Sequence, residues 1–81
     1  MVVYPNPVTG KQVTLQLNSP AGNYTLRVFA ANGQVVKTET IIHPGGSYSK
    51  TIELPGQLPA GHYYMQVTGG EQVISSKLII Q

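Results

Sequence analysis

The chain contains no cysteine and no aspartate. Without cysteine it can form neither a disulfide nor a thiolate metal site. Its acids are Glu39, Glu53 and Glu71, all at polar strand or turn positions, where glutamates are ordinarily solvated. A calcium site draws on several carboxylates and glycoside hydrolysis on a converging pair, so neither is expected.

Cations are also few. Five lysines and arginines give a formal net charge of +2, and they are spread along the chain rather than clustered. Nucleic-acid binding depends on clustered cations, so no nucleic-acid partner is expected. No apolar run approaches the ~20 residues of a membrane-spanning helix, and the N-terminus lacks the charged-then-apolar pattern of a signal peptide. The sequence therefore predicts no membrane span.

Helical periodicity is missing as well, because apolar and polar residues alternate almost everywhere. Val13–Leu17 is a clear example of this strand pattern. About seven such segments lie between turn signals, which predicts an all-β antiparallel sandwich. With 81 residues there is room for one core, so residues 1–81 are expected to form a single domain.

A repeated segment dominates what is present. Pro20–Val28 and Pro59–Val67 share Pro, Ala, Gly, Tyr and Val in register. The first copy runs into Asn32-Gly33 and the second into Gly69-Gly70, and an apolar strand follows each. Asn-Gly favours a type I′ turn, in which both central residues have positive φ. We expect one hairpin unit used twice, with the two halves packed face to face.

Alternation also predicts which side chains face the core. Val8–Lys11 is expected to be a loop. Lys50 interrupts the inward set formed by Tyr48, Ile52 and Leu54. Leu78–Ile80 is too apolar to lie unpaired. That last segment must pair centrally in a sheet or dock on a partner. The inward sets are Tyr24, Leu26, Val28 and Ala30; Tyr48, Ile52 and Leu54; Tyr63, Met65 and Val67; and Ile74, Leu78 and Ile80.

Residues for catalysis are scarce. His43 and His62 are the only histidines, and the Gly-x-Ser-x-Gly turn that would carry a nucleophile is missing. Two histidines without further ligands do not make a metal site. His62 is expected to be an exposed polar residue. We therefore expect a non-catalytic chain with no cofactor and no small-molecule substrate.

Tyrosines could form a platform for sugars. Tyr24, Tyr48 and Tyr63 fall on the predicted core face, where tyrosines are ordinary packing residues. Only Tyr64 and Phe29 point the other way, without the convergent polar groups of a ligand site. Packing is the better interpretation.

Three motifs follow one another along the chain: Tyr4-Pro5-Asn6-Pro7, Pro59-Ala60-Gly61-His62-Tyr63 and Lys77-Leu78-Ile79-Ile80. In this order and spacing the chain resembles, over nearly all of its length, the type A C-terminal sorting domain of proteins exported by the type IX secretion system of Bacteroidota. The resemblance implies an immunoglobulin-like sandwich of seven strands at the end of a larger cargo protein, whose own domains lie upstream.

The same resemblance implies a function and its partners. Such a domain is an address that the outer-membrane translocon and its shuttle proteins recognise, and in many members a sortase then removes it and attaches the cargo to the cell surface. The cargo is thus secreted through the periplasm to the surface or the extracellular space. The recognition residues that the resemblance assigns are Lys77, Leu78, Ile79 and Ile80, with Gly61 and Tyr63, and with Tyr4, Pro5, Asn6 and Pro7.

Other interpretations remain open. Gly61, Tyr63 and the opening prolines could be structural, and Leu78–Ile80 could be simply a core strand. An exposed edge of the last strand could be bound by strand addition, with Lys77 and Ile79 facing outward. The alternative function is a fibronectin-like spacer or adhesin domain of a surface protein, possibly one that binds carbohydrate.

Overall fold

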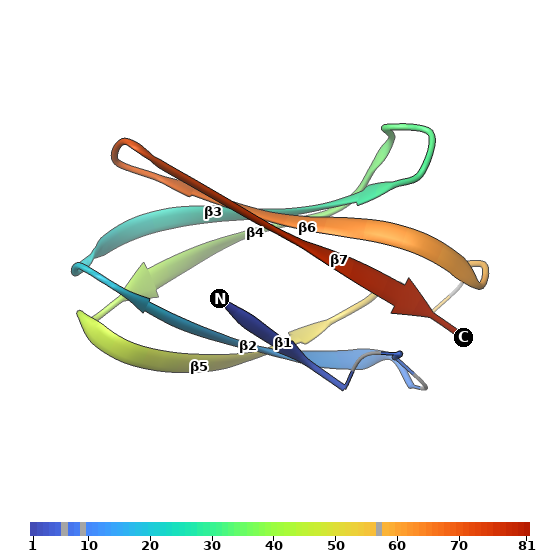
Figure 1. Cartoon of the computed structure of the whole chain (residues 1–81), viewed down its shortest axis with the longest axis horizontal. Helices are drawn as coiled ribbons and strands as arrows, with labels where there is room; N and C mark the ends of the chain where they lie inside the picture. The colour runs from blue at the N-terminus through green and yellow to red at the C-terminus, as the bar shows by residue number, and fades with distance from the viewer. Residues whose placement is uncertain (6, 9, 57) are drawn as a thin grey trace.

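The computed structural model describes residues 1–5, 7–8, 10–56 and 58–81. Within these ranges the chain forms seven strands and no helix (Figure 1). No segment of these ranges is a helix long and apolar enough to cross a membrane. The strands are β1 (Val2–Tyr4), β2 (Gln12–Ser19), β3 (Gly22–Ala30), β4 (Val35–His43), β5 (Gly46–Glu53), β6 (Gly61–Gly69) and β7 (Gln72–Ile80).

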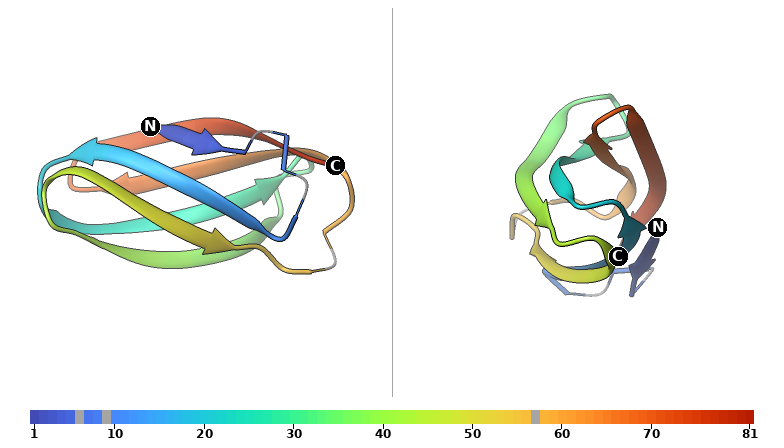
Figure 2. Two further views of the ribbon diagram at one scale, coloured as in Figure 1. Left: turned by 90° about the horizontal axis from the view of Figure 1, so that it is seen from below. Right: turned by 90° about the vertical axis from the view of Figure 1, so that its left-hand side faces the viewer.

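The strands form two sheets that lie one over the other (Figure 2). One sheet has the order β1-β2-β5 and the other β4-β3-β6-β7, and every pairing of neighbouring strands is antiparallel. This confirms the predicted sandwich. The order β1-β2-β5 and β3-β6-β7 follows the A-B-E and C-F-G strands of immunoglobulin domains, with β4 added beside β3.

The repeated segments supply the two central strands of the larger sheet. β3 pairs antiparallel with β6, and Arg27 lies opposite Gln66, which holds the same position in the other copy. A local two-fold axis therefore passes between these residues and relates the hairpin β3–β4 to the hairpin β6–β7. The double use of one hairpin is confirmed, but the face-to-face packing was wrong. The copies lie side by side because β3 and β6 use their backbone edges to bind each other.

The first hairpin turns differently from the prediction. Gly33 has a φ of 91°, but no non-glycine residue in the described ranges has a positive φ, so Asn32 cannot occupy a type I′ position. The Gly33 N–H donates to Ala30 O at 2.9 Å, and the Asn32 Oδ1 accepts from Gln34 N at 3.0 Å. This is a type I turn followed by a left-handed glycine, a common longer hairpin loop.

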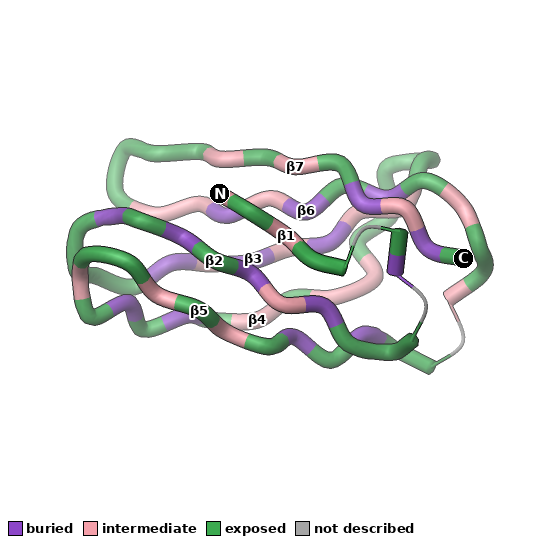
Figure 3. The backbone as a smooth tube through the Cα atoms, turned by 60° about the horizontal axis from the view of Figure 1, so that its bottom comes forward, coloured by how far each residue is buried: buried purple, intermediate pink, exposed green. Residues whose placement is uncertain are grey.

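Core packing follows the predicted alternation, which Figure 3 shows most clearly along β2, β3 and β6, where buried residues alternate with less buried ones. Tyr48 and Ile74 are half-buried members of the inward sets. Buried residues that were not predicted include Val8 and His43, at 0% and 2% exposure. The buried apolar residues are Val8, Val13, Leu15, Leu17, Tyr24, Leu26, Val28, Ile41, Ile52, Leu54, Tyr63, Met65, Val67, Leu78 and Ile80.

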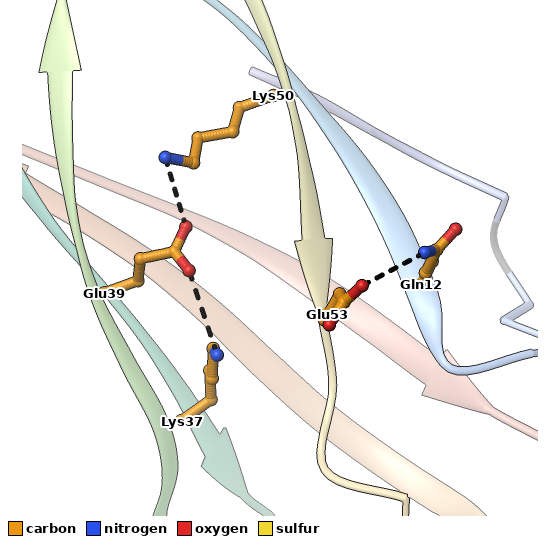
Figure 4. Close-up of polar contacts among 5 residues, drawn as sticks. All are labelled: Gln12, Lys37, Glu39, Lys50 and Glu53. Atoms are coloured by element: carbon orange, nitrogen blue, oxygen red, sulfur yellow. Dashed lines mark hydrogen bonds and ion pairs between the residues drawn. The ribbon is translucent and has the colours of Figure 1, made fainter.

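Charged side chains lie between the sheets along one side of the sandwich. Lys37 and Glu39 of β4 share the face of Ile41 and His43, and Lys50 of β5 points toward them (Figure 4). Glu39 lies 3.8 Å from the Lys37 Nζ and 3.5 Å from the Lys50 Nζ. This ion-pair cluster explains why Lys50 interrupts an inward set, since it joins the edges of the two sheets.

The terminal strand is an edge strand, not a central one. β6 is the only neighbouring strand of β7 in the described sheet, so of the two expectations for Leu78–Ile80 the central pairing is not met, and docking on a partner stays a prediction. These residues nevertheless pack well, because the start of the chain returns to cover them. That return forms the candidate site.

Candidate functional site

The second and third sequence motifs and Val8, the residue directly after the first motif, meet at the end of β7. Gly61 lies opposite Ile80, and Tyr63 lies opposite Leu78, in the antiparallel pairing of β6 with β7. On the other side of Ile80, Val8 forms a parallel bridge. The last residues of β7 therefore run between a segment from the opening of the chain and a segment from the second repeat.

Val8 holds the terminal strand through two backbone hydrogen bonds, which we call the Val8 clasp. Its N–H donates to Ile79 O at 2.7 Å, and its carbonyl accepts from Gln81 N at 3.0 Å. Its side chain is fully buried in the core. Val8 directly follows Pro7, so the opening motif delivers the clasp to β7. The loop predicted over Val8–Lys11 holds at Gly10 and Lys11, which lie outside the strands, but Val8 itself forms a buried strand bridge, and Thr9 lies outside the described residues.

The opening motif itself lies at the surface. Tyr4 closes β1, pairs with Thr14 of β2 and is 46% exposed. The Tyr4–Pro5 peptide bond is cis, and Pro5 and Pro7 are exposed. Asn6 lies outside the described residues. The motif thus turns the chain from the edge of one sheet to the edge of the other.

Gly61 and Tyr63 have structural work at the start of β6. The Tyr63 hydroxyl donates to Pro59 O at 2.6 Å while its ring is 5% exposed. This is the tyrosine corner of immunoglobulin-like sandwiches, at the position where those domains have it. Gly61 has a φ of 156°, a backbone conformation that side-chain-bearing residues rarely adopt.

The first repeat builds the same arrangement at the other end of the sheet. The Tyr24 hydroxyl donates to Pro20 O at 2.7 Å, and Gly22 has a φ of 157°. Because the first copy makes the same contacts far from the β7 terminus, the Pro-Ala-Gly-x-Tyr segment serves the fold wherever it occurs. The sequence signal for this was the repeat itself.

The terminal quartet divides between two faces. Leu78 and Ile80 are buried, at 0% and 7% exposure. Lys77 is exposed and Ile79 half-buried on the outer face of the four-stranded sheet, the face turned away from the other sheet. Only Lys77 and Ile79 of this quartet can therefore present side chains to a partner of the folded domain.

Aromatic residues adjoin those two side chains on the outer face. Lys77 lies opposite Tyr64, which in turn lies opposite Phe29 of β3. Ile79 lies opposite the exposed His62. The expected exposure of His62 is confirmed, and Tyr64 is 47% exposed. Apolar and cationic groups are thus combined beside the terminal strand.

The other histidine is a structural residue. His43 Nδ1 accepts from Gly45 N, and Nε2 lies 2.9 Å from Leu17 O, so the ring carries its proton on Nε2. The rings of Tyr24 and Tyr48 flank it, with centroid distances of 5.6 and 5.3 Å. These bonds fix the turn between β4 and β5, and the ring is buried in the core. Its alternation with Ile41 was the signal that could have placed it in the core.

No three histidine, cysteine, aspartate or glutamate residues in the described part of the chain gather as metal ligands would. The site instead consists of the backbone hydrogen bonds of the Val8 clasp and of the exposed side chains beside β7. Comparison with known protein families gives a match to the secretion system C-terminal sorting domain over residues 2–81. The chain belongs to this family.

The sorting domain therefore carries a type IX secretion signal, which indicates export across the outer membrane to the cell surface or the extracellular space. Interaction with the type IX secretion machinery follows from membership, and the resemblance found in the sequence is confirmed. A search of curated proteins gives no match. Domains of this family are generally non-catalytic.

Proposed function

We propose that residues 1–81 form a single non-catalytic domain whose terminal strand β7 is the element recognised by the export machinery. The observation that carries this proposal is that the last residues of β7 lie between the second motif in β6 and Val8, which directly follows the first motif. The domain follows its cargo, and the translocon, its shuttle proteins and the sortase are its partners. Removal by the sortase then leaves the cargo attached to the surface.

The motif residues divide into two roles in this proposal. Lys77 and Ile79 are the side chains that a partner contacts on the outer face. The others place the strand: Leu78 and Ile80 anchor it in the core, and Gly61 and Tyr63 align β6 beside it. The opening motif of Tyr4, Pro5, Asn6 and Pro7 acts in this proposal through Val8, which directly follows it and bonds to the edge of β7.

Export of a fusion protein tests this function. A periplasmic reporter followed by residues 1–81 should leave a type IX-competent cell, and deletion of Lys77–Gln81 should hold it in the periplasm. Because the deletion also removes core residues, Lys77→Ala with Ile79→Ala is the sharper variant. Its matched control is Ser49→Ala with Thr51→Ala, two exposed positions of β5. Retention of the intact fusion would refute the proposal.

A spacer or adhesin domain that binds carbohydrate is the second candidate. The observation in its favour is the cross-strand pair of Phe29 and the half-exposed Tyr64 on the outer face. On this hypothesis Tyr64→Ala abolishes binding to a glycan array and leaves export of the reporter unchanged. Loss of export without any glycan binding by the parent domain would dismiss it.

A further inference from the structure

Sheet edges invite unwanted pairing, and three of the four edges in this sandwich carry a protecting feature. β1 is only three residues long. β4 has inward-pointing Lys37 and Glu39, and β5 has inward-pointing Lys50. Short edges and inward charges both oppose the addition of a further strand. The fourth edge, β7, has nine residues and no inward charge.

The local two-fold axis makes this difference specific. Lys37 lies opposite Val28, and Ile74 lies opposite Val67, where Val28 and Val67 are equivalent residues of the repeat. Glu39 lies opposite Leu26, and Ser76 lies opposite Met65. Because Leu26 and Met65 are equivalent residues of the repeat, Glu39 corresponds to Ser76. The two positions that protect β4 with charge are therefore apolar and neutral in β7.

The Val8 clasp covers only one end of β7. Ile79 O and Gln81 N point away from β6 toward Val8, and alternate residues of a strand point their backbone groups the same way. The N–H and C=O of Val73 and Ser75 therefore also point outward, and no described residue bonds to them. Val73 is 62% exposed, and Ile74 is only half-buried although it faces inward.

We infer that an extended segment of a partner protein adds as a strand along Gln72–Ser76 of β7. The inference rests on the proposed function, and it specifies how the export machinery binds β7. Side chains of the added segment alternate, so one set is apolar and covers Ile74. The other set lies on the outer face beside Lys77 and is acidic, in keeping with the domain's net charge of +2. A second copy fits less well, since it carries the same net charge.

Amide hydrogen exchange on residues 1–81 tests this without any variant. The probe is a synthetic peptide of alternating valine and glutamate, and its control alternates valine and lysine. With the first peptide, exchange at Val73 and Ser75 should slow by about tenfold, the effect of one new hydrogen bond per amide. Ile74 and Ser76 amides face β6 and should not change. Unchanged exchange at Val73 and Ser75, or equal slowing by the lysine peptide, overturns the inference.

Ser75→Pro provides a matched genetic test. Proline removes the outward N–H and no bond to β6, and edge strands tolerate it at such positions. Ser75→Ala removes the hydroxyl and keeps the N–H. Peptide affinity and reporter export should fall by about tenfold in the proline variant only. If it does not fold, as judged by circular dichroism, the exchange experiment on the parent domain decides.

The outcomes separate the two proposals. Failure of the parent fusion to leave the cell refutes the proposed function. Export of the parent and equal export of folded Ser75→Pro refutes strand addition and leaves the function in place. A concentration-dependent dimer whose Val73 and Ser75 amides become protected would assign the edge to a second copy and also refutes the inference.

Discussion

At the scale of single residues, the Pro-Ala-Gly-x-Tyr segment shows how side chains fix the ends of strands. The alternation placed Tyr24 and Tyr63 in the core, and both are buried. Their hydroxyl partners, Pro20 O and Pro59 O, could not be predicted from alternation, because the bond depends on how the preceding loop turns back. A buried tyrosine hydroxyl usually finds such a partner.

Removing the hydroxyl of Tyr63 should therefore be costly. Tyr63→Phe leaves Pro59 O without its donor and should lower the free energy of unfolding by about 1–2 kcal/mol. Tyr63→Ala also removes the buried ring and should cost about 3–5 kcal/mol. Urea denaturation measures both, with Tyr64→Phe as the control because Tyr64 is 47% exposed. Equal effects at the two tyrosines would contradict the tyrosine corner.

At one position, Ala30 in the first copy and Gly69 in the second, the two copies of the repeat differ by a single methyl group. A Cβ on Gly69 would lie within van der Waals overlap of the Tyr24 ring, with Cγ at 2.8 Å. Ala30 holds the equivalent place opposite Tyr63, where its methyl group is accommodated. Gly69→Ala should displace Tyr24 from Pro20 O and lower the free energy of unfolding by about 1–3 kcal/mol.

Gly10→Ala is the control for this substitution. A Cβ on Gly10 meets no atom within 4 Å, so the free energy of unfolding should change by less than about 0.5 kcal/mol. Thermal or urea unfolding of both variants measures the difference. A Gly69→Ala protein as stable as Gly10→Ala would show that the Tyr24 ring moves aside without loss.

At the scale of the elements, period-two alternation was enough to predict the strands and their inward faces. It missed Val8, because a one-residue bridge has no period and its partner lies at the other end of the chain. It also gave the wrong turn at Asn32-Gly33, because this dipeptide fits both a two-residue and a three-residue hairpin loop. The β-bulge between Val28 and Phe29 shifts the pairing by one residue, and only the longer loop fits the shifted pairing.

The Val8 clasp should contribute strongly to stability. Val8→Ala removes two methyl groups from a fully buried side chain and should lower the free energy of unfolding by about 2 kcal/mol. The exchange rate of the Gln81 amide should rise at the same time, because its bond to Val8 O loosens. Val2→Ala, in β1 and 55% exposed, should change neither quantity. If the exchange rate of the Gln81 amide is the same in Val8→Ala as in the parent, the Val8 clasp does not hold the end of β7.

At the scale of the whole molecule, the sequence predicted a sandwich but not which strands would be its edges. Two copies of a hairpin can pack face to face or side by side, and alternation is the same in both cases. The difference lies in backbone pairing between distant strands, which leaves no periodic signal. The inward charges of β4 and β5 were visible in the sequence, yet only the strand order gives them a purpose.

Those charges should matter more for solubility than for stability. The ion pairs of Glu39 with Lys37 and Lys50 are partly exposed, and such pairs contribute only about 0–1 kcal/mol. Replacing all three residues by threonine should leave the free energy of unfolding nearly unchanged. Sedimentation should nevertheless show new oligomers, because both edges then accept strands. Threonine at Thr38, Thr40 and Thr51 is already tolerated by the same strands.

The Val8 clasp joins residues from the start and the end of the domain, so it can form only when the whole domain has been synthesised. Within the domain, Val8 leaves the ribosome before β2 to β7, whereas Ile79 and Gln81, which bond to it, emerge only after the other six strands. A polypeptide interrupted before β7 would leave β6 without its neighbour and the opening segment without its anchor. Translation must therefore reach β7 before the clasp can form, and a truncated chain lacks the strand that we propose the export machinery recognises.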